Sequence, residues 1–280
     1  MAKVLITCDS TADLDRLFSE RSIPFTPLTV LLGDREGEDG VEIFPADIFK
    51  YFDENKVTPK TSAVSQEKYY EFFKNRTDRG YEIVHFTISA SMSVCYENAC
   101  RAATECGSVY VVDAQSLSTG IGLSVLYAQD LAAEGFSGAE IVEKVSARRH
   151  KVQASFVVDT MTFLQKGGRC SSIAAFVASV LSLKPCINVI DGKMLVGKKY
   201  HGKTSKAIKM YVKDMLEKYP NIDKKYVFIT HSSAESETIE AARKLVLEAY
   251  PGANVIVTTA GATITSHCGK GTLGVLFFAE

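Results

Sequence analysis

This sequence lacks an excess of charge of either sign. Its 32 Lys and Arg residues are balanced by 33 Asp and Glu residues, which leaves a formal net charge of −1 over 280 residues. Nucleic-acid binding depends on clustered Lys and Arg that neutralise phosphates. No nucleic-acid partner is therefore expected.

Cysteine pairs and long hydrophobic runs are also lacking. The seven Cys are odd in number and none stands in a C-x-x-C pair, so the sequence indicates neither a disulfide framework nor a metal site. The longest apolar stretch, residues 173–183, is too short to span a bilayer. Because the N-terminus enters a strand-like run at once, with no signal peptide, we expect a cytoplasmic protein.

Motifs of known catalytic chemistry are scarce as well. The sequence has no G-x-S-x-G elbow and no H-E-x-x-H, and Asp9-Ser10 is better explained as a helix cap than as a nucleophile. Residues 197–204 fit the Walker A expression, but they follow a short hairpin arm and no Walker B strand comes after them. Residues 269–274 match G-x-G-x-x-G without room for the helix that should follow. No catalytic residue, nucleotide site or cofactor is predicted.

What the sequence does contain is a regular alternation of short apolar runs and helical patterns. This alternation is typical of a parallel sheet covered on both faces, and so of an α/β fold. Strands are expected at 3–8, 82–87, 109–113, 156–159, 226–230 and 254–259, and helices at about 65–78, 92–106, 119–134, 138–149, 171–182, 204–219 and 234–250.

A second kind of sheet is predicted in the C-terminal half. Asp191-Gly192 between apolar runs 186–190 and 194–196 is typical of a two-residue hairpin turn, and a last strand is expected at 274–279. We therefore expect two domains: a mostly parallel N-terminal α/β domain, residues 1–155, and a C-terminal α/β domain with antiparallel strands, residues 156–280. The boundary is approximate, and a discontinuous arrangement stays open.

Small polar clusters follow five of the expected strands, beginning at residues 9, 87, 113, 159 and 231. Ligands of open parallel sheets bind beyond the carboxyl ends of the strands. Helix capping explains any single cluster, but five at one edge of one sheet favour a binding crevice. The segment 261–278 adds hydroxyls, His267 and four glycines, which suits a carboxylate or phosphate unless the segment is only a turn.

Seven sequence blocks, in order along the whole chain, resemble the DegV family. Each block is weak alone, but their order and spacing together are specific. The blocks are Asp9–Leu14, Thr61–Ser65, Ser91–Tyr96, residues 112–122, residues 159–169, Leu183–Pro185 with Asp191-Gly192, and residues 266–271.

The resemblance implies a carrier without catalytic activity of its own. It implies that one long-chain fatty acid lies in a tunnel between two α/β domains and that its carboxyl group is presented to the catalytic subunit of a bacterial fatty acid kinase. That subunit would form acyl phosphate for phospholipid synthesis, and transient membrane contact would fit the role. The carboxylate would be held by Thr61, Ser93 and His267, with Ser62 and Arg169 as supporting residues; for Arg169 we favour pinning the domains together over closing on the ligand.

The chemistry of such a ligand fits those residue types. A buried carboxylate needs several donors, which two hydroxyls and a protonated His267 would supply. Each buried methylene contributes about 0.8 kcal/mol, so the tail would dominate the affinity. Candidates for an apolar tunnel wall, which are explained equally well as ordinary core, are Phe156, Phe163, Phe176 and Leu181.

At two positions the sequence departs from the family pattern, and these departures affect which family properties we expect here. Val94 stands where the family has Gly, and we expect it to narrow the approach to the carboxyl group. His201 lies in the segment Tyr200-His201-Gly202-Lys203, where the family usually carries an Arg on the side expected to face the kinase. An alternative of a different class stays open: an enzyme, a hydrolase or phosphotransferase, acting on a small anionic substrate in the same crevice.

Overall fold

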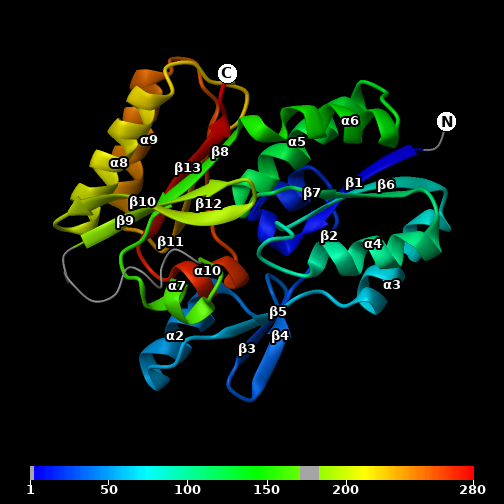
Figure 1. The fold of residues 1–280 in the computed structure, drawn as a ribbon, viewed down its shortest axis with the longest axis horizontal. Helices are drawn as coiled ribbons and strands as arrows, with labels where there is room; N and C mark the ends of the chain where they lie inside the picture. The colour runs from blue at the N-terminus through cyan, green and yellow to red at the C-terminus, as the bar shows by residue number, and fades with distance from the viewer. Residues whose placement is uncertain (1–2, 171–182) are drawn as a thin grey trace.

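The computed structural model describes residues 3–170 and 183–280 and contains three sheets (Figure 1). The strand orders are β2-β1-β6-β7, β10-β9-β8-β13-β11-β12 and β4-β3-β5. The mixed α/β fold agrees with the sequence prediction. No helix in the described ranges is both long and apolar enough to cross a membrane.

The first sheet is entirely parallel, as predicted for the N-terminal part. Helices α3 and α4 pack on one face of it and α5 and α6 on the other (Figure 1). Two of these helices begin at serine caps, Ser65 for α3 and Ser137 for α6. The elements are β1 (Lys3–Asp9), α1 (Leu17–Glu20), β2 (Phe25–Thr26), α3 (Gln66–Thr77), β6 (Tyr81–Thr87), α4 (Cys95–Cys106), β7 (Val109–Asp113), α5 (Thr119–Ala133) and α6 (Gly138–Arg148).

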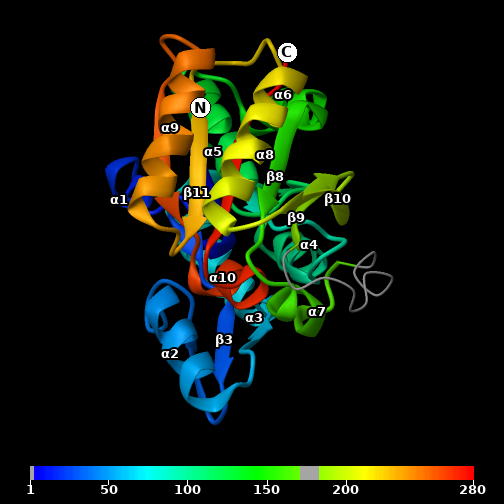
Figure 2. The ribbon, with the colours of Figure 1, turned by 90° about the vertical axis from the view of Figure 1, so that its left-hand side faces the viewer.

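The second sheet is mixed, with antiparallel strands in the C-terminal part as predicted. Strand β13 runs antiparallel to both of its neighbours, and β11 and β12 are parallel. Helices α8 and α9 cover the outer face (Figures 1 and 2). The elements are β8 (Val152–Val157), β9 (Leu183–Ile190), β10 (Lys193–His201), α8 (Thr204–Lys218), β11 (Val227–Ser232), α9 (Ser236–Ala249), β12 (Val255–Thr259) and β13 (Thr272–Phe278).

Helix α5 lies between the two large sheets. It contacts β1 and β6 of the first sheet and β8 and β13 of the second. Its residues are buried along both sides, which explains why the sequence of α5 is apolar around most of its circumference. The helix thus joins both sheets into one continuous hydrophobic core.

A small third layer has no counterpart among the predicted elements. It comprises β3 (Thr29–Leu32), β4 (Arg35–Glu38), α2 (Pro45–Asn55) and β5 (Lys60–Ser62). It packs against two short helices of the C-terminal part, α7 (Thr162–Gly167) and α10 (Ala262–Cys268), which lie beside it in Figures 1 and 2. The N-terminal third of the chain therefore reaches under the second sheet.

The predicted hairpin is present and is longer than expected. Asp191 and Gly192 both have positive φ, 48° and 76°, as a type I′ turn requires. The Gly192 carbonyl accepts a hydrogen bond of 2.7 Å from the hydroxyl of buried Ser89, which follows β6. The hairpin tip is thereby joined to the first sheet.

Two sequence expectations differ from the structure, and a third concerns residues outside the described ranges. Strand β8 begins four residues before the predicted start at Phe156, so the predicted domain boundary at 155/156 falls inside β8; the division itself stays a prediction. The five polar clusters follow strands of two sheets, not of one. The predicted helix 171–182, with Phe176 and Leu181, lies outside the described residues.

Candidate ligand-binding site

An apolar pocket lies between the two large sheets and the small third layer. Its empty volume, which includes space open to solvent, is about 850 Å³. The side chains of its apolar wall come from both sheets and from α7. They include Met92, Leu117, Phe156, Leu164, Met194 and Leu276.

Of the two predicted tunnel residues that the structure describes, one lines this pocket and the other does not. Phe156, on β8, is part of the wall. Phe163, on α7, packs on Phe52 of α2 with ring centroids 4.7 Å apart and belongs to the core of the third layer.

All three residues predicted to hold a carboxylate line the same pocket. Thr61 is on β5, Ser93 is in the loop before α4, and His267 is in the last turn of α10. The Thr61 hydroxyl and His267 Nε2 are 2.8 Å apart and hydrogen-bonded, although they are separated by 206 positions in the sequence. Ser62 and Arg169, the predicted supporting residues, also line the pocket, and both are exposed.

His267 is neutral in this structure. Burial lowers the pKa of His267 to about 4, and the neighbouring charge of Arg169 acts in the same direction. The expectation of a protonated His267 concerned the protein with a carboxylate bound, and it stays a prediction. Its Nδ1 is buried and has no hydrogen-bond partner within residues 3–170 and 183–280.

Gly167 explains how this ring fits beside α7. A Cβ at this position would lie 2.3 Å from His267 Nδ1, which is far inside contact distance. The first glycine of the Gly-Gly-Arg block thus makes room for the imidazole. Arg169 donates from Nη1 to the Gly167 carbonyl at 2.7 Å, and its role of pinning the domains together stays a prediction.

The departure at Val94 does not narrow the pocket. Its side chain is 56% exposed and is absent from the pocket wall as far as the chain is described. Its φ of −80° and ψ of 6° are open to any residue, so glycine is not required here. The Ser-x-Ser block consequently keeps Ser93 at the pocket without the family's glycine.

Two buried aspartates, which sequence reasoning did not assign, hold α10 in place. Asp13 accepts hydrogen bonds from Gly261 N (2.9 Å) and from the Ser118 hydroxyl (2.5 Å). Asp39 accepts from Ala262 N (2.7 Å) and from the Ser10 hydroxyl (2.8 Å). Burial raises the pKa of both carboxyl groups, while these hydrogen bonds oppose the shift.

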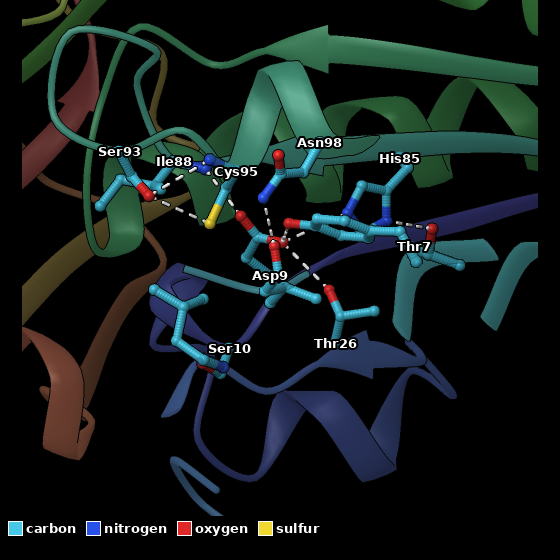
Figure 3. A network of polar contacts seen from close by, with 12 residues as sticks. Thr7, Asp9, Ser10, Thr26, His85, Ile88, Ser93, Cys95 and Asn98 are labelled. Carbon is cyan, nitrogen blue, oxygen red and sulfur yellow. Dashed lines mark hydrogen bonds and ion pairs between the residues drawn. The ribbon is translucent and has the colours of Figure 1, made fainter. Parts of the chain in front are cut away.

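The prediction that Asp9-Ser10 caps a helix is also corrected. Ser10 donates to Asp39 instead of capping a helix, and Asp9 makes no side-chain cap in the described part of the chain. Asp9 lies at the centre of a buried network in which it accepts hydrogen bonds from several donors, among them Thr26 and the amide of Ile88 (Figure 3). Neither residue reaches the ligand pocket.

The Walker-like segment is not a phosphate-wrapping loop. Its residues 197–201 lie in β10, paired with β9, and only its last residue, Thr204, begins a helix. The Thr204 hydroxyl donates to Asp159, which is also paired with Lys184. His201, in the segment predicted to face a kinase, is exposed at the end of β10.

Fold and pocket together define a class: an α/β protein with an apolar pocket that ends in hydroxyls and a neutral imidazole. The profile of the family described as "Uncharacterised protein, DegV family" matches residues 3–280. The chain therefore belongs to the DegV family.

Individual relatives match this chain over nearly its whole length. A DegV domain-containing protein of Clostridium perfringens is 30% identical over 290 residues, covering 100% of this chain and 99% of that protein. A Thermotoga maritima protein named fatty acid-binding protein is 30% identical, covering 97% and 96%. The solved structure of a DegV family protein from Thermus thermophilus, titled for its fatty acid binding, has a TM-score of 0.90 at 29% identity and covers 100% of both chains.

Proposed function

We propose that this protein binds one long-chain fatty acid in the pocket and presents the carboxyl group of that acid to a fatty acid kinase subunit. The observation that carries the proposal is the joining of Thr61 and His267 at the polar end of an otherwise apolar pocket. The relatives named for fatty acid binding support the ligand class. The protein acts as a carrier, and the chemistry belongs to its partner.

The apolar wall accounts for most of the expected affinity. A tail of about fifteen methylenes at about 0.8 kcal/mol each offers on the order of 10 kcal/mol before the costs of ordering and association. Leu164, Met194 and Leu276 are side chains that such a tail would contact. The head-group residues then contribute register and orientation more than strength.

The polar end suits a carboxyl group. The hydroxyls of Thr61 and Ser93 are neutral donors, and Arg169 brings a positive charge near His267. A carboxylate placed beside His267 would raise the pKa of the imidazole back toward its ordinary value. Binding of the anion is therefore expected to take up protons when the pH is near 6.

The exposure of the supporting residues favours presentation to a partner. Ser62 and Arg169 line the pocket and are also exposed, so the polar end lies next to solvent. A carboxyl group held there is accessible to a phosphoryl donor carried by another protein. The kinase role itself comes from the family resemblance stated above.

Mass spectrometry of the organic extract of the purified protein tests whether the protein carries a fatty acid. One fatty acid per chain is expected. The double variant Thr61→Ala/Ser93→Ala should lose about fivefold to about 160-fold in fatty acid affinity, since each of the two hydrogen bonds contributes about 0.5–1.5 kcal/mol. The matched control is Ser19→Ala/Thr104→Ala, two exposed hydroxyls that bond only to carbonyls of their own segments.

Unchanged fatty acid occupancy in the Thr61→Ala/Ser93→Ala variant would refute the head-group assignment. A protein that binds no fatty acid, but whose melting temperature rises with ATP and magnesium, would favour the alternative of a phosphotransferase. Acyl phosphate formed by a fatty acid kinase only when this protein is present would establish the presenting role.

A further inference from the structure

Helix α10 is part of the wall of the ligand pocket and carries one of the head-group residues. The pocket-lining residues of α10 are Thr263, Ile264, His267 and Cys268. His267 stands in the last turn, where its Nε2 meets the hydroxyl of Thr61. The other two head-group residues, Thr61 and Ser93, come from different elements. The position of α10 therefore decides where the imidazole lies relative to their hydroxyls.

The sequence of α10 gives this helix little stability of its own. It is seven residues long, whereas an isolated helix needs about 12–15 residues to be even marginally stable. Two Thr and one Ile are β-branched residues, which lower the helix propensity further. Contacts with the rest of the protein must therefore hold α10 in place.

Two carboxylates make such contacts at the start of α10. Asp13 Oδ1 accepts from the Gly261 amide at 2.9 Å, and Asp39 Oδ1 accepts from the Ala262 amide at 2.7 Å. Both oxygens lie close to Gly261, since a Cβ at this position would be 3.1 Å from each. Asp13 is 3% exposed and Asp39 1%, so water hardly competes for these hydrogen bonds. Neither aspartate lines the pocket, so any effect on a ligand must pass through α10 or another neighbour.

The two aspartates connect α10 to different parts of the fold. Asp13 lies in the segment after β1 of the first sheet, and Asp39 directly follows β4 of the small third layer. Each carboxylate is itself held by a hydroxyl, Asp13 by Ser118 and Asp39 by Ser10. Figures 1 and 2 show α10 between the third layer and the strands of the second sheet. The start of the helix is thus fixed to the first sheet and to the third layer.

We propose that Asp13 and Asp39 are positioning residues: by holding the first amides of α10, they place His267 where it binds the carboxyl group of the ligand. A hydrogen bond weakens steeply once its distance or angle leaves the normal range, whereas a flexible acyl tail adapts to a small shift of the pocket wall. A displaced α10 therefore costs the head group more than the tail. This inference rests on the proposed binding of fatty acids.

The test is the ratio of the dissociation constants for palmitic acid and methyl palmitate at pH 6.5, measured by displacement of a fluorescent fatty acid. The ester has the same tail but carries no charge. Asp39→Ala removes the acceptor of the Ala262 amide, and we expect the acid to lose about twofold to about twelvefold more affinity than the ester, the effect of one hydrogen bond. Asp39→Asn keeps an oxygen for this amide and should restore most of the preference for the acid. Asp39 is the better target because Asp13 also holds Ser118, which lines the pocket.

Controls separate positioning from a general loss of stability. Asp53→Ala changes an exposed acid of the same third layer, and Thr26→Val removes a buried hydroxyl that donates to Asp9; both should leave the ratio unchanged. In a His267→Gln background the shift caused by Asp39→Ala should vanish, because the effect acts through His267. A merely structural role of Asp39 would weaken the acid and the ester equally.

Gly261→Ala is a milder variant for the case in which Asp39→Ala does not fold. The Gly261 backbone, with φ of −63° and ψ of 176°, accepts any residue. The added methyl group would lie 3.1 Å from an oxygen of each aspartate, so the carboxylates must shift by a few tenths of an ångström. We expect the ratio to change in the same direction as in Asp39→Ala, by a smaller factor.

Four outcomes overturn the inference: an unchanged ratio in Asp39→Ala and Gly261→Ala, an equal weakening of acid and ester, a shift that persists without His267, or a failure of both variants to fold, which would make the aspartates structural. If the wild-type protein binds neither ligand, the proposed function fails first. If His267→Gln weakens the binding of palmitic acid but the ratio does not respond to Asp39 or Gly261, only the positioning role fails.

Discussion

Two polar clusters inside this protein differ in how completely their hydrogen bonds are satisfied. In the Asp9 cluster (Thr7, Asp9, Thr26, Tyr69 and His85), Asp9 accepts from Thr26, Tyr69, His85 and a backbone amide, while His85 Nδ1 pairs with Thr7 (Figure 3). In the head-group cluster (Thr61, Ser93 and His267), His267 keeps a buried Nδ1 without a partner in the described ranges.

The difference separates a structural cluster from a binding site. Buried polar atoms are nearly always hydrogen-bonded, because leaving one unpaired costs about 1–3 kcal/mol. A cluster that satisfies all its members stabilises the fold and has nothing left for a ligand. The head-group cluster instead lines an apolar pocket with the hydroxyl-bearing residues Thr61 and Ser93, to which a ligand can add hydrogen bonds.

The largest expected effect is in the Asp9 cluster. Asp9→Ala leaves four donors without their acceptor in a site that is closed to water, so the free energy of unfolding should fall by about 3–5 kcal/mol. Urea denaturation followed by circular dichroism measures this change.

Asp53→Ala is the matched control, since Asp53 is an exposed acid on α2 and its removal should stay within about 0.5 kcal/mol of the wild type. A loss below about 1 kcal/mol for Asp9→Ala would mean that the cluster does not stabilise the fold and that the comparison is mistaken.

A smaller effect is expected from pH at the head-group cluster. The pKa of His267 is about 4 in the folded protein, against about 6.5 in an unfolded chain. The unfolded chain therefore binds more protons between these values. The contribution of His267 to stability is complete above pH 6.5 and is lost as the pH falls toward 4, by up to about 1.4 kcal/mol per pH unit.

The free energy of unfolding measured at pH 7.5, 6.5 and 5.5 checks this prediction. His267→Gln should flatten the slope of this free energy against pH. The control His150→Gln, at an exposed histidine, should leave the slope as in the wild type. Saturating fatty acid should reduce the slope too, because a carboxylate favours the protonated imidazole. A slope that is identical in the wild type and in His267→Gln would contradict the depressed pKa.

Periodicity predicted the large elements because each is long enough to repeat its pattern. Strands β1, β6 and β7 of the first sheet and the helices α3, α5, α8 and α9 were placed to within a few residues, whereas β2 was not predicted. Strands β3, β4 and β5 are three or four residues long, and no pattern of apolar spacing develops over so few positions. The layer that they form was therefore missed.

Helix α10 was missed for a different reason. Its sequence, Ala262-Thr-Ile-Thr-Ser-His-Cys268, is rich in β-branched residues that favour strands. Asp13 and Asp39 bond to the amides at its start and stabilise a helix that the local sequence does not favour. A contact across more than 220 positions in the chain, the separation of Asp39 from Ala262, cannot be read from a local pattern.

The family resemblance predicted which residues form the site, and the structure adds their burial, their hydrogen bonds and the pKa of His267. The sequence carries no signal for the burial that makes His267 neutral, nor for the hydrogen bond between His267 and Thr61. The burial and the partners of a side chain depend on neighbours from several elements, so a local sequence pattern does not predict them.

The smallest expected effects compare one hydroxyl from each cluster. Thr26→Val removes a buried donor that lies 3.0 Å from Asp9, and the free energy of unfolding should fall by about 1 kcal/mol with no change in fatty acid affinity. Ser93→Ala removes a half-buried hydroxyl whose partner is a weakly accepting sulfur, and we expect a loss of stability below about 0.5 kcal/mol with a clear loss of affinity. Urea denaturation and fatty acid titration of both variants measure the two quantities. The reverse pattern, with Thr26→Val weakening fatty acid binding and Ser93→Ala mainly lowering stability, would exchange the roles that we assign to the two clusters.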